Sequence, residues 1–260
     1  MKRYLVLISI GALALGMAPV RAQSRSDLGS SRGPLHGPSF GGSLVKLFGE
    51  NSEFTAMLEL RTQGGPTDET MLVPGQLAFD QGKSRFEMDI SKIQSAKMPP
   101  AVGAQMKALG MEKLITISRP DKKASYMLYP GLQSYVESRI QGNEGPEEFK
   151  VETTELGKET VEGHPCVRNK KIIIDKEGKQ HESIVWNATD LKEFPVKIQT
   201  AEGDVQVSML FKDVKLSKPD SSQFDMPTNF KKYDDMMTLM QQGMMRRLDD
   251  GQKISPGAKP

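Results

Sequence analysis

Short segments in which apolar and polar residues alternate follow one another through most of this chain, separated by turns rich in Gly, Pro and Asp. In the first of them Phe54, Leu58 and Leu60 recur with a period of two, which places them on one face of an extended strand. A second such segment contains Pro74-Gly75, which predicts a break or bulge there. We count about eleven strand segments joined by short turns, and this spacing predicts an antiparallel meander that curls into a barrel or half-barrel.

Two segments replace this period with helical spacing. Met98 to Met111 carries Met106 and Leu109 on one helical face, and the paired prolines after Met98 suit a helix start. The second helix is predicted over 231–250, and its face at i, i+3 and i+7 carries Met237, Met240 and Met244. The fold class predicted is therefore mainly β with α, in which a short inserted helix and a C-terminal helix cover the sheet.

The methionines of these helices have three interpretations. They form an ordinary core face, or an adaptable surface that lines a site for apolar ligands, because Met is flexible and polarizable. Thioethers also bind Cu(I), but no His or Cys is interleaved with this stripe. The presence of methionines on both predicted helices favours ligand lining over copper.

The single tryptophan, Trp186, ends an apolar run, and a polar turn separates it from a new extended segment at Phe194-Pro195. This pattern predicts a hairpin with a large aromatic side chain at its mouth. The indole either anchors the core or forms the wall of a cavity.

The N-terminal residues predict an exported protein. Residues 1–22 combine a basic start, an apolar run and a small-x-small cleavage site, which is typical of a secretory signal peptide. The signal carries three basic residues and no acidic one, so its removal lowers the formal net charge from +2 to −1. That charge excludes an electrostatic case for nucleic-acid binding. Residues 23–43 predict a flexible leader and residues 251–260 a loose tail.

Catalytic and metal-binding patterns are missing from the sequence. It contains neither a Gly-x-Ser-x-Gly elbow nor a His-Glu-x-x-His or Cys-x-x-Cys motif, and its three histidines are scattered. The lone cysteine, Cys166, is either buried or pairs with another molecule. We therefore expect a protein that is not an enzyme and that uses no cofactor and no metal.

Two short motifs add a resemblance to a family. The segment from Ile184-Val185-Trp186 to Phe194-Pro195-Val196-Lys197 is similar to a late hairpin of the LolA-like superfamily, which includes the periplasmic outer-membrane lipoprotein carrier and related lipid-binding envelope proteins. Gly163-His164-Pro165-Cys166 resembles a motif of an uncharacterised bacterial branch of that group. The resemblance covers roughly Glu53 to Phe230 of a half-barrel domain expected over 44–230, and the Met-rich C-terminal helix departs from the carrier.

This resemblance implies an unclosed antiparallel β-barrel whose helices cover an apolar cavity for acyl chains. The expected function is binding of a lipid or a lipidated protein by a soluble protein of the bacterial periplasm. An envelope protein is a second candidate partner. A Cu(I)-binding envelope protein and a structural module with a filled core are the alternatives. The residues expected to line the cavity are Trp186, Met98, Met106, Leu109, Met237, Met240 and Met244.

Overall fold

The computed structural model describes residues 42–64, 69–96, 98–140, 149–242 and 245. The predicted signal peptide, nearly all of the leader, the tail and Met244 lie outside these residues. In the described part, no helix is long and apolar enough to cross a membrane.

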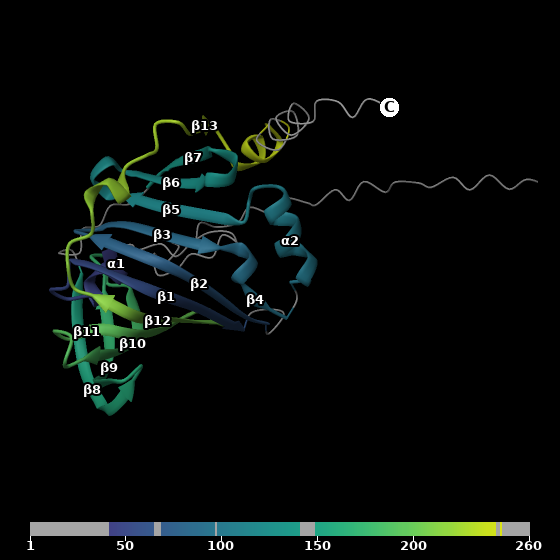
Figure 1. Ribbon diagram of the computed structural model, residues 1–260. Helices are drawn as coiled ribbons and strands as arrows, with labels where there is room; N and C mark the ends of the chain where they lie inside the picture. Colours follow the sequence, from purple (N-terminus) through teal and green to yellow (C-terminus); the bar gives the residue numbers. More distant parts are fainter. Residues whose placement is uncertain (1–41, 65–68, 97, 141–148, 243–244, 246–260) are drawn as a thin grey trace, which may run out of the picture.

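One sheet of thirteen strands dominates the described residues (Figure 1). Its strands are β1 (Glu53–Gly64), β2 (Glu69–Asp80), β3 (Lys83–Asp89), β4 (Gln94–Ser95), β5 (Lys113–Arg119), β6 (Ala124–Tyr129), β7 (Ser134–Arg139), β8 (Lys150–Val161), β9 (His164–Ile174), β10 (Gln180–Ala188), β11 (Phe194–Glu202), β12 (Val205–Lys215) and β13 (Lys231–Tyr233). Their order is β13-β7-β6-β5-β3-β2-β1-β12-β11-β10-β9-β8, with β4 paired to β2. Every pairing is antiparallel except that of β13 with β7. The prediction of a mainly β, unclosed antiparallel sheet is confirmed, with thirteen strands where the sequence indicated about eleven.

Pairing of β1 with β12 joins the two halves of the meander. Leu58 lies opposite Phe211 and Leu60 opposite Met209, so the apolar faces of both halves become continuous. Figure 1 shows β8 to β11 steeply inclined to β1, β2 and β3, so the sheet is strongly curved.

β2 continues through Pro74, which pairs with Glu59, so the predicted break is absent. Its neighbour Gly75 is required by packing, because a Cβ there would lie 2.4 Å from the Phe86 ring and 2.7 Å from the carbonyl oxygen of Glu87.

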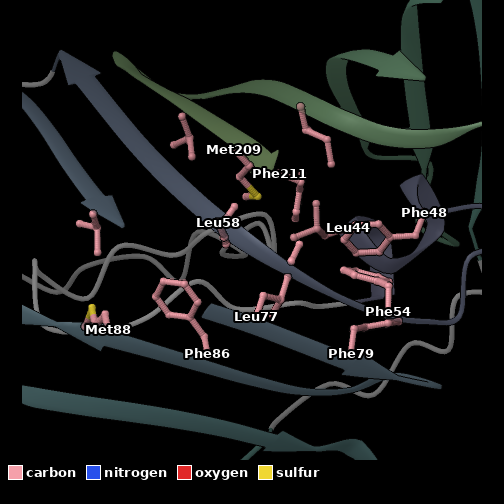
Figure 2. Packing of buried hydrophobic residues seen from close by; sticks show 14 of the residues in the cluster. Leu44, Phe48, Phe54, Leu58, Leu77, Phe79, Phe86, Met88, Met209 and Phe211 are labelled. Carbon is pink, nitrogen blue, oxygen red and sulfur yellow. The ribbon is translucent and has the colours of Figure 1, made fainter. Parts of the chain in front are cut away.

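Aromatic side chains fill the inner face of the sheet beside α1 (Gly42–Leu47). Phe48, directly after this helix, is 1% exposed, and its ring centroid lies 4.9 Å from that of Phe54 and 5.3 Å from that of Phe79. Figure 2 shows these rings together, with Leu58 and Leu77 further along the same apolar face. This end of the inner face is therefore a filled core.

A smaller apolar cluster lies on the outer face of β5 and β6. Phe224, at the end of the 3-10 helix η5 (Ser221–Phe224), packs with Ile115, Ile117 and Leu128. Arg119 fixes this segment, because its Nη1 donates to the carbonyl oxygen of Phe224 at 3.1 Å. The chain after β12 therefore covers this part of the outer face.

The remaining helices are short. They are η1 (Ile90–Lys92), α2 (Pro100–Ala108), η2 (Pro120–Lys122), η3 (Pro130–Leu132) and a helical segment at residues 236–242. The predicted C-terminal helix of 231–250 thus begins later, since Lys231–Tyr233 add a parallel strand to β7. The inserted helix predicted over Met98 to Met111 is present as α2.

Candidate functional site

Methionine side chains connect α2 to the inner face of the sheet. Met98, Met106 and Leu109 are partly buried and pack against the main core. The end of this helix is held by the N–H of Met111, which donates to the carbonyl oxygen of Met106 at 2.8 Å. Three of the residues predicted to line a ligand cavity therefore lie together, in and beside α2. We call α2 and the helical segment 236–242 the helical cover of the inner face.

The helical segment 236–242 begins at a capping residue. Asp235 Oδ1 accepts a hydrogen bond from the Thr238 N–H and Oδ2 from the Thr238 hydroxyl, both at 2.8 Å, and these bonds lower the pKa of the carboxyl group. Because the helix starts directly after Asp235, the Leu239 side chain points into the core and is fully buried, whereas Met237 is 71% exposed.

The inward face of this segment differs from the predicted stripe. Met236 and Met240 are partly buried against the core on either side of Leu239, whereas Met237 points to solvent. Met237 and Met240 therefore diverge, although their i, i+3 spacing suggested a common face. The sequence pattern failed here because Met occupies both faces of the helix and does not distinguish them.

Trp186 lies on the outer face of β10. Its cross-strand partners are Lys197 and Arg168, whose cationic groups lie 4.3 and 5.8 Å from the indole ring centre. The indole Nε1 donates to Glu159 Oε1 of β8 at 2.5 Å. Its neighbour Val185 points into the core on the opposite face. Trp186 is 5% exposed and belongs to the main core cluster, against which Met98, Met106 and Leu109 also pack. Contact of these residues with a ligand stays a prediction.

A cation and a buried hydroxyl lie side by side on the inner face of β9 and β10. Lys171 pairs across the strands with Ser183, and alternation places both on the face that buries Ile173. Lys171 makes no ion pair with any described residue, and burial lowers its pKa. Ser183 is 1% exposed, and its Oγ has no hydrogen-bond partner in the described protein.

Sequence reasoning missed this pair. The alternation around Ile173 was a usable signal, because it places Lys171 on the buried side of its strand. Which hydroxyl stands opposite the lysine depends on the register of two strands, which the sequence does not show.

The region of Cys166 does not form a nucleophilic site. Cys166 is 3% exposed, its Sγ donates to the carbonyl oxygen of His164 at 3.3 Å, and burial raises the pKa of the thiol. The His164 ring instead pairs with Asp190 at 2.9 Å. Among the described residues no group of three or more His, Cys, Asp or Glu is placed to hold a metal ion.

Comparison with known proteins gives only distant similarities. No family model and no curated protein matches the sequence. A LolA superfamily protein from Nitrosomonas europaea has a TM-score of 0.33 at 10% identity, over 71% of this chain and 94% of its own. The Mycobacterium tuberculosis lipoprotein LppX has a TM-score of 0.35 at 11% identity, over 66% of this chain and 91% of its own. MucB bound to MucA from Pseudomonas aeruginosa has a TM-score of 0.35 at 10% identity, over 72% of this chain and 61% of its own.

These similarities are too low to establish a family. The matched structures include a LolA superfamily protein, which belongs to the group that the hairpin motifs resemble. The fold itself is assigned from the sheet described above. The chain is therefore defined by its own architecture, an unclosed and mostly antiparallel β-sheet whose inner face is covered by short helices.

Proposed function

We propose that this protein is an exported, non-enzymatic protein that binds an acyl chain, of a lipid or a lipidated protein, between the inner face of the sheet and its helical cover. The observation that carries this proposal is the nature of the cover. α2 and the segment 236–242 close an apolar face through a few partly buried side chains, most of them methionines. Met adapts its shape to a changing neighbour, so such a cover can be displaced by an apolar chain and repack around it.

The energy of this exchange is favourable for an ordinary acyl chain. Burial contributes about 0.8 kcal/mol per methylene, so a twelve-carbon chain gains roughly 10 kcal/mol before the costs of association. The cover loses some of its own apolar contacts with the sheet in the process, which reduces the net gain.

The inner face also offers a place for the polar end of such a ligand. Lys171 is a half-buried cation without an ion-pair partner among the described residues, and Ser183 presents a buried hydroxyl beside it. Glu193 already attracts this lysine electrostatically, and a carboxylate or phosphate at this position would add a direct ion pair and supply a hydrogen-bond acceptor for the serine. The proposed ligand is therefore an anionic amphiphile.

Binding of two matched probes tests this assignment. We expect dodecanoate to bind more tightly than dodecanol, and Lys171→Met to weaken dodecanoate binding about tenfold while leaving dodecanol unchanged, because only the carboxylate uses the lysine. Calorimetry measures both affinities, and mass spectrometry of natively purified protein identifies any acyl ligand that is carried along. If neither probe binds and no lipid co-purifies, the inner face is a filled core and the protein is a structural module.

A disulfide lock tests whether α2 is the part that moves. A Cβ on Gly103 of α2 would lie 3.3 Å from the Cβ of Ser91 in η1, close to the spacing of a disulfide. In a Cys166→Ser background, the Ser91→Cys, Gly103→Cys protein should lose dodecanoate uptake when oxidised and regain it when reduced. Uptake that is equal in both states would show that the ligand does not enter under α2.

Leucine replacements distinguish this function from copper binding. Changing Met237, Met240 and Met244 to Leu keeps an apolar cover but removes the thioethers that bind Cu(I). Acyl binding should survive the exchange. Loss of a Cu(I) titration signal in the variant, together with no acyl binding by the native chain, would favour the copper alternative.

A further inference from the structure

A polar cleft of about 780 Å³ lies on the outer side of the sheet, away from the helical cover. Alternation shows this directly: Lys197 and Gln199 of β11 line the cleft, while Ile198 between them is buried in the core. The turn between β8 and β9 closes one end of the cleft with Val161 and Glu162. Its volume is in the usual range for small-molecule sites.

Each carboxylate of this cleft lies within ion-pair distance of a lysine. Glu59 pairs with Lys212 at 2.9 Å, Glu162 lies 3.8 Å from the same ammonium group, and Glu182 pairs with Lys170 at 2.6 Å. Two lysines thus offset three carboxylates, which leaves one negative charge on this wall.

Two further cations of the cleft have no such partner among the described residues. Arg61 makes no ion pair or hydrogen bond with any described residue, and Lys197, likewise without an ion pair among them, has its ammonium group 4.3 Å from the centre of the Trp186 ring. With Lys170 and Lys212 counted, four cationic groups stand against three carboxylates, and this surplus of positive charge attracts anions. The chemistry of the cleft therefore favours a negatively charged ligand.

Strand register sets the spacing of these cations. Lys197 stands opposite Leu210, which stands opposite Glu59, and Arg61 follows Glu59 by two residues on the same face. The strand spacing then places the Cα atoms of Arg61 and Lys197 about 12 Å apart. Both side chains can reach one ligand of monosaccharide size that lies between them.

The surface between the two cations is rich in groups that both donate and accept hydrogen bonds. Ser208 and the Gln199 amide lie between them, and the amides of Gln63 and Gln206 follow on the far side of Arg61. A ligand with several hydroxyl groups matches such a surface, since each hydroxyl also donates and accepts. The cleft lies mainly across β1, β12, β11 and β10 in the middle of the sheet, and the edge strand β8 reaches it only with its last residue, so the cleft does not follow an edge where an extended peptide would pair with the main chain.

We propose that this outer cleft binds a hydroxyl-rich organic anion, a sugar acid or a sugar phosphate, with Arg61 and Lys197 holding the anionic group. Arg61 and Lys197 lie on the opposite face of the sheet from Lys171, whereas Ser183 on the inner face also borders the cleft. The two cations of this site take no part in the proposed acyl binding.

Calorimetric titration with glucuronate, glucose 6-phosphate, glucose and inorganic phosphate tests the proposal. We expect both sugar anions to bind, with affinity falling as salt is added, and neutral glucose to bind at least tenfold more weakly. Whichever sugar anion binds more tightly identifies carboxylate or phosphate as the preferred group. Inorganic phosphate that binds as well as glucose 6-phosphate would overturn the role of the hydroxyl groups.

Arg61→Gln should weaken the sugar anions about tenfold or more, because a charge-assisted hydrogen bond is lost. Arg139→Gln is the matched control, since Arg139 is an exposed arginine at the end of β7, outside the cleft. Circular dichroism confirms that both variants are folded. Equal affinities in Arg61→Gln and the native protein, or a preference for triglutamate over both sugar anions, would overturn the proposal.

Discussion

Truncation of Phe48 to alanine tests whether α1 belongs to the permanent core or to the movable cover. The Phe48 ring is 1% exposed, and its centroid lies between 4.9 and 6.0 Å from those of Phe54, Phe79, Phe194 and Phe211. These four rings come from β1, β2, β11 and β12, so Phe48 connects strands of both halves of the sheet. Four separately anchored strands cannot all move inward to fill the space that the missing ring leaves.

We therefore expect Phe48→Ala to lower the free energy of unfolding by as much as truncation of any fully buried phenylalanine. Such truncations cost about 3–5 kcal/mol, which is a large part of the 5–15 kcal/mol by which a typical domain is stable. With a urea m-value of about 2–3 kcal/mol per molar, the unfolding midpoint should fall by roughly 1–2 M.

Urea unfolding followed by the fluorescence of Trp186 measures this loss. Met57→Ala is the control on β1, because Met57 is 37% exposed and its truncation should change the free energy of unfolding by about 0.5 kcal/mol or less. A loss below about 1 kcal/mol for Phe48→Ala would refute our reasoning, and would place α1 among the parts that detach before the sheet unfolds.

Three further predictions concern single residues. Gly75→Ala should lower the thermal midpoint, with a cost of about 1–3 kcal/mol, because its Cβ would clash with the Phe86 ring and with backbone; an unchanged midpoint would contradict this packing. The Cys166 thiol should react with a disulfide reagent only after denaturation, since it is buried and its pKa is raised; rapid reaction of the folded protein would disprove the burial. In the ligand-free protein, Lys171→Met should raise the free energy of unfolding at pH 7, because burial of the charged lysine lowers its pKa in the folded state. The penalty of burying the charge is present at neutral pH and disappears as the pH rises through the lowered pKa toward the unfolded value near 10.5. The stability that Lys171→Met adds should therefore shrink over this range. An added stability that is constant with pH would argue against titration of this lysine.

Local sequence patterns predicted the strands well. The period of two in β1 and β3 identified the buried positions Phe54, Leu58, Phe86 and Met88, because alternation is a property of each strand by itself. The helical spacing in α2 was equally visible. The same reasoning failed at β13, where three residues form a strand only because β7 provides a partner.

The candidate sites depended on contacts that no local pattern contains. The sequence predicted Trp186 as either a core anchor or a cavity wall, whereas its position on the outer face follows from its pairing with Lys197 and from its hydrogen bond to Glu159 of β8. Lys171 became noticeable only beside Ser183.

The sequence by itself determined the alternation of each strand, the helical interruption and the chemical inventory, because these follow from the spacing of neighbouring residues. Tertiary structure alone decided that β1 lies beside β12, which joins two apolar faces into one core. It also decided that Arg61 and Lys197 share a cleft and that Trp186 stands between Lys197 and Arg168 of the neighbouring strands. These outcomes depend on strand order, register and curvature, which arise from packing between segments that are far apart in the chain.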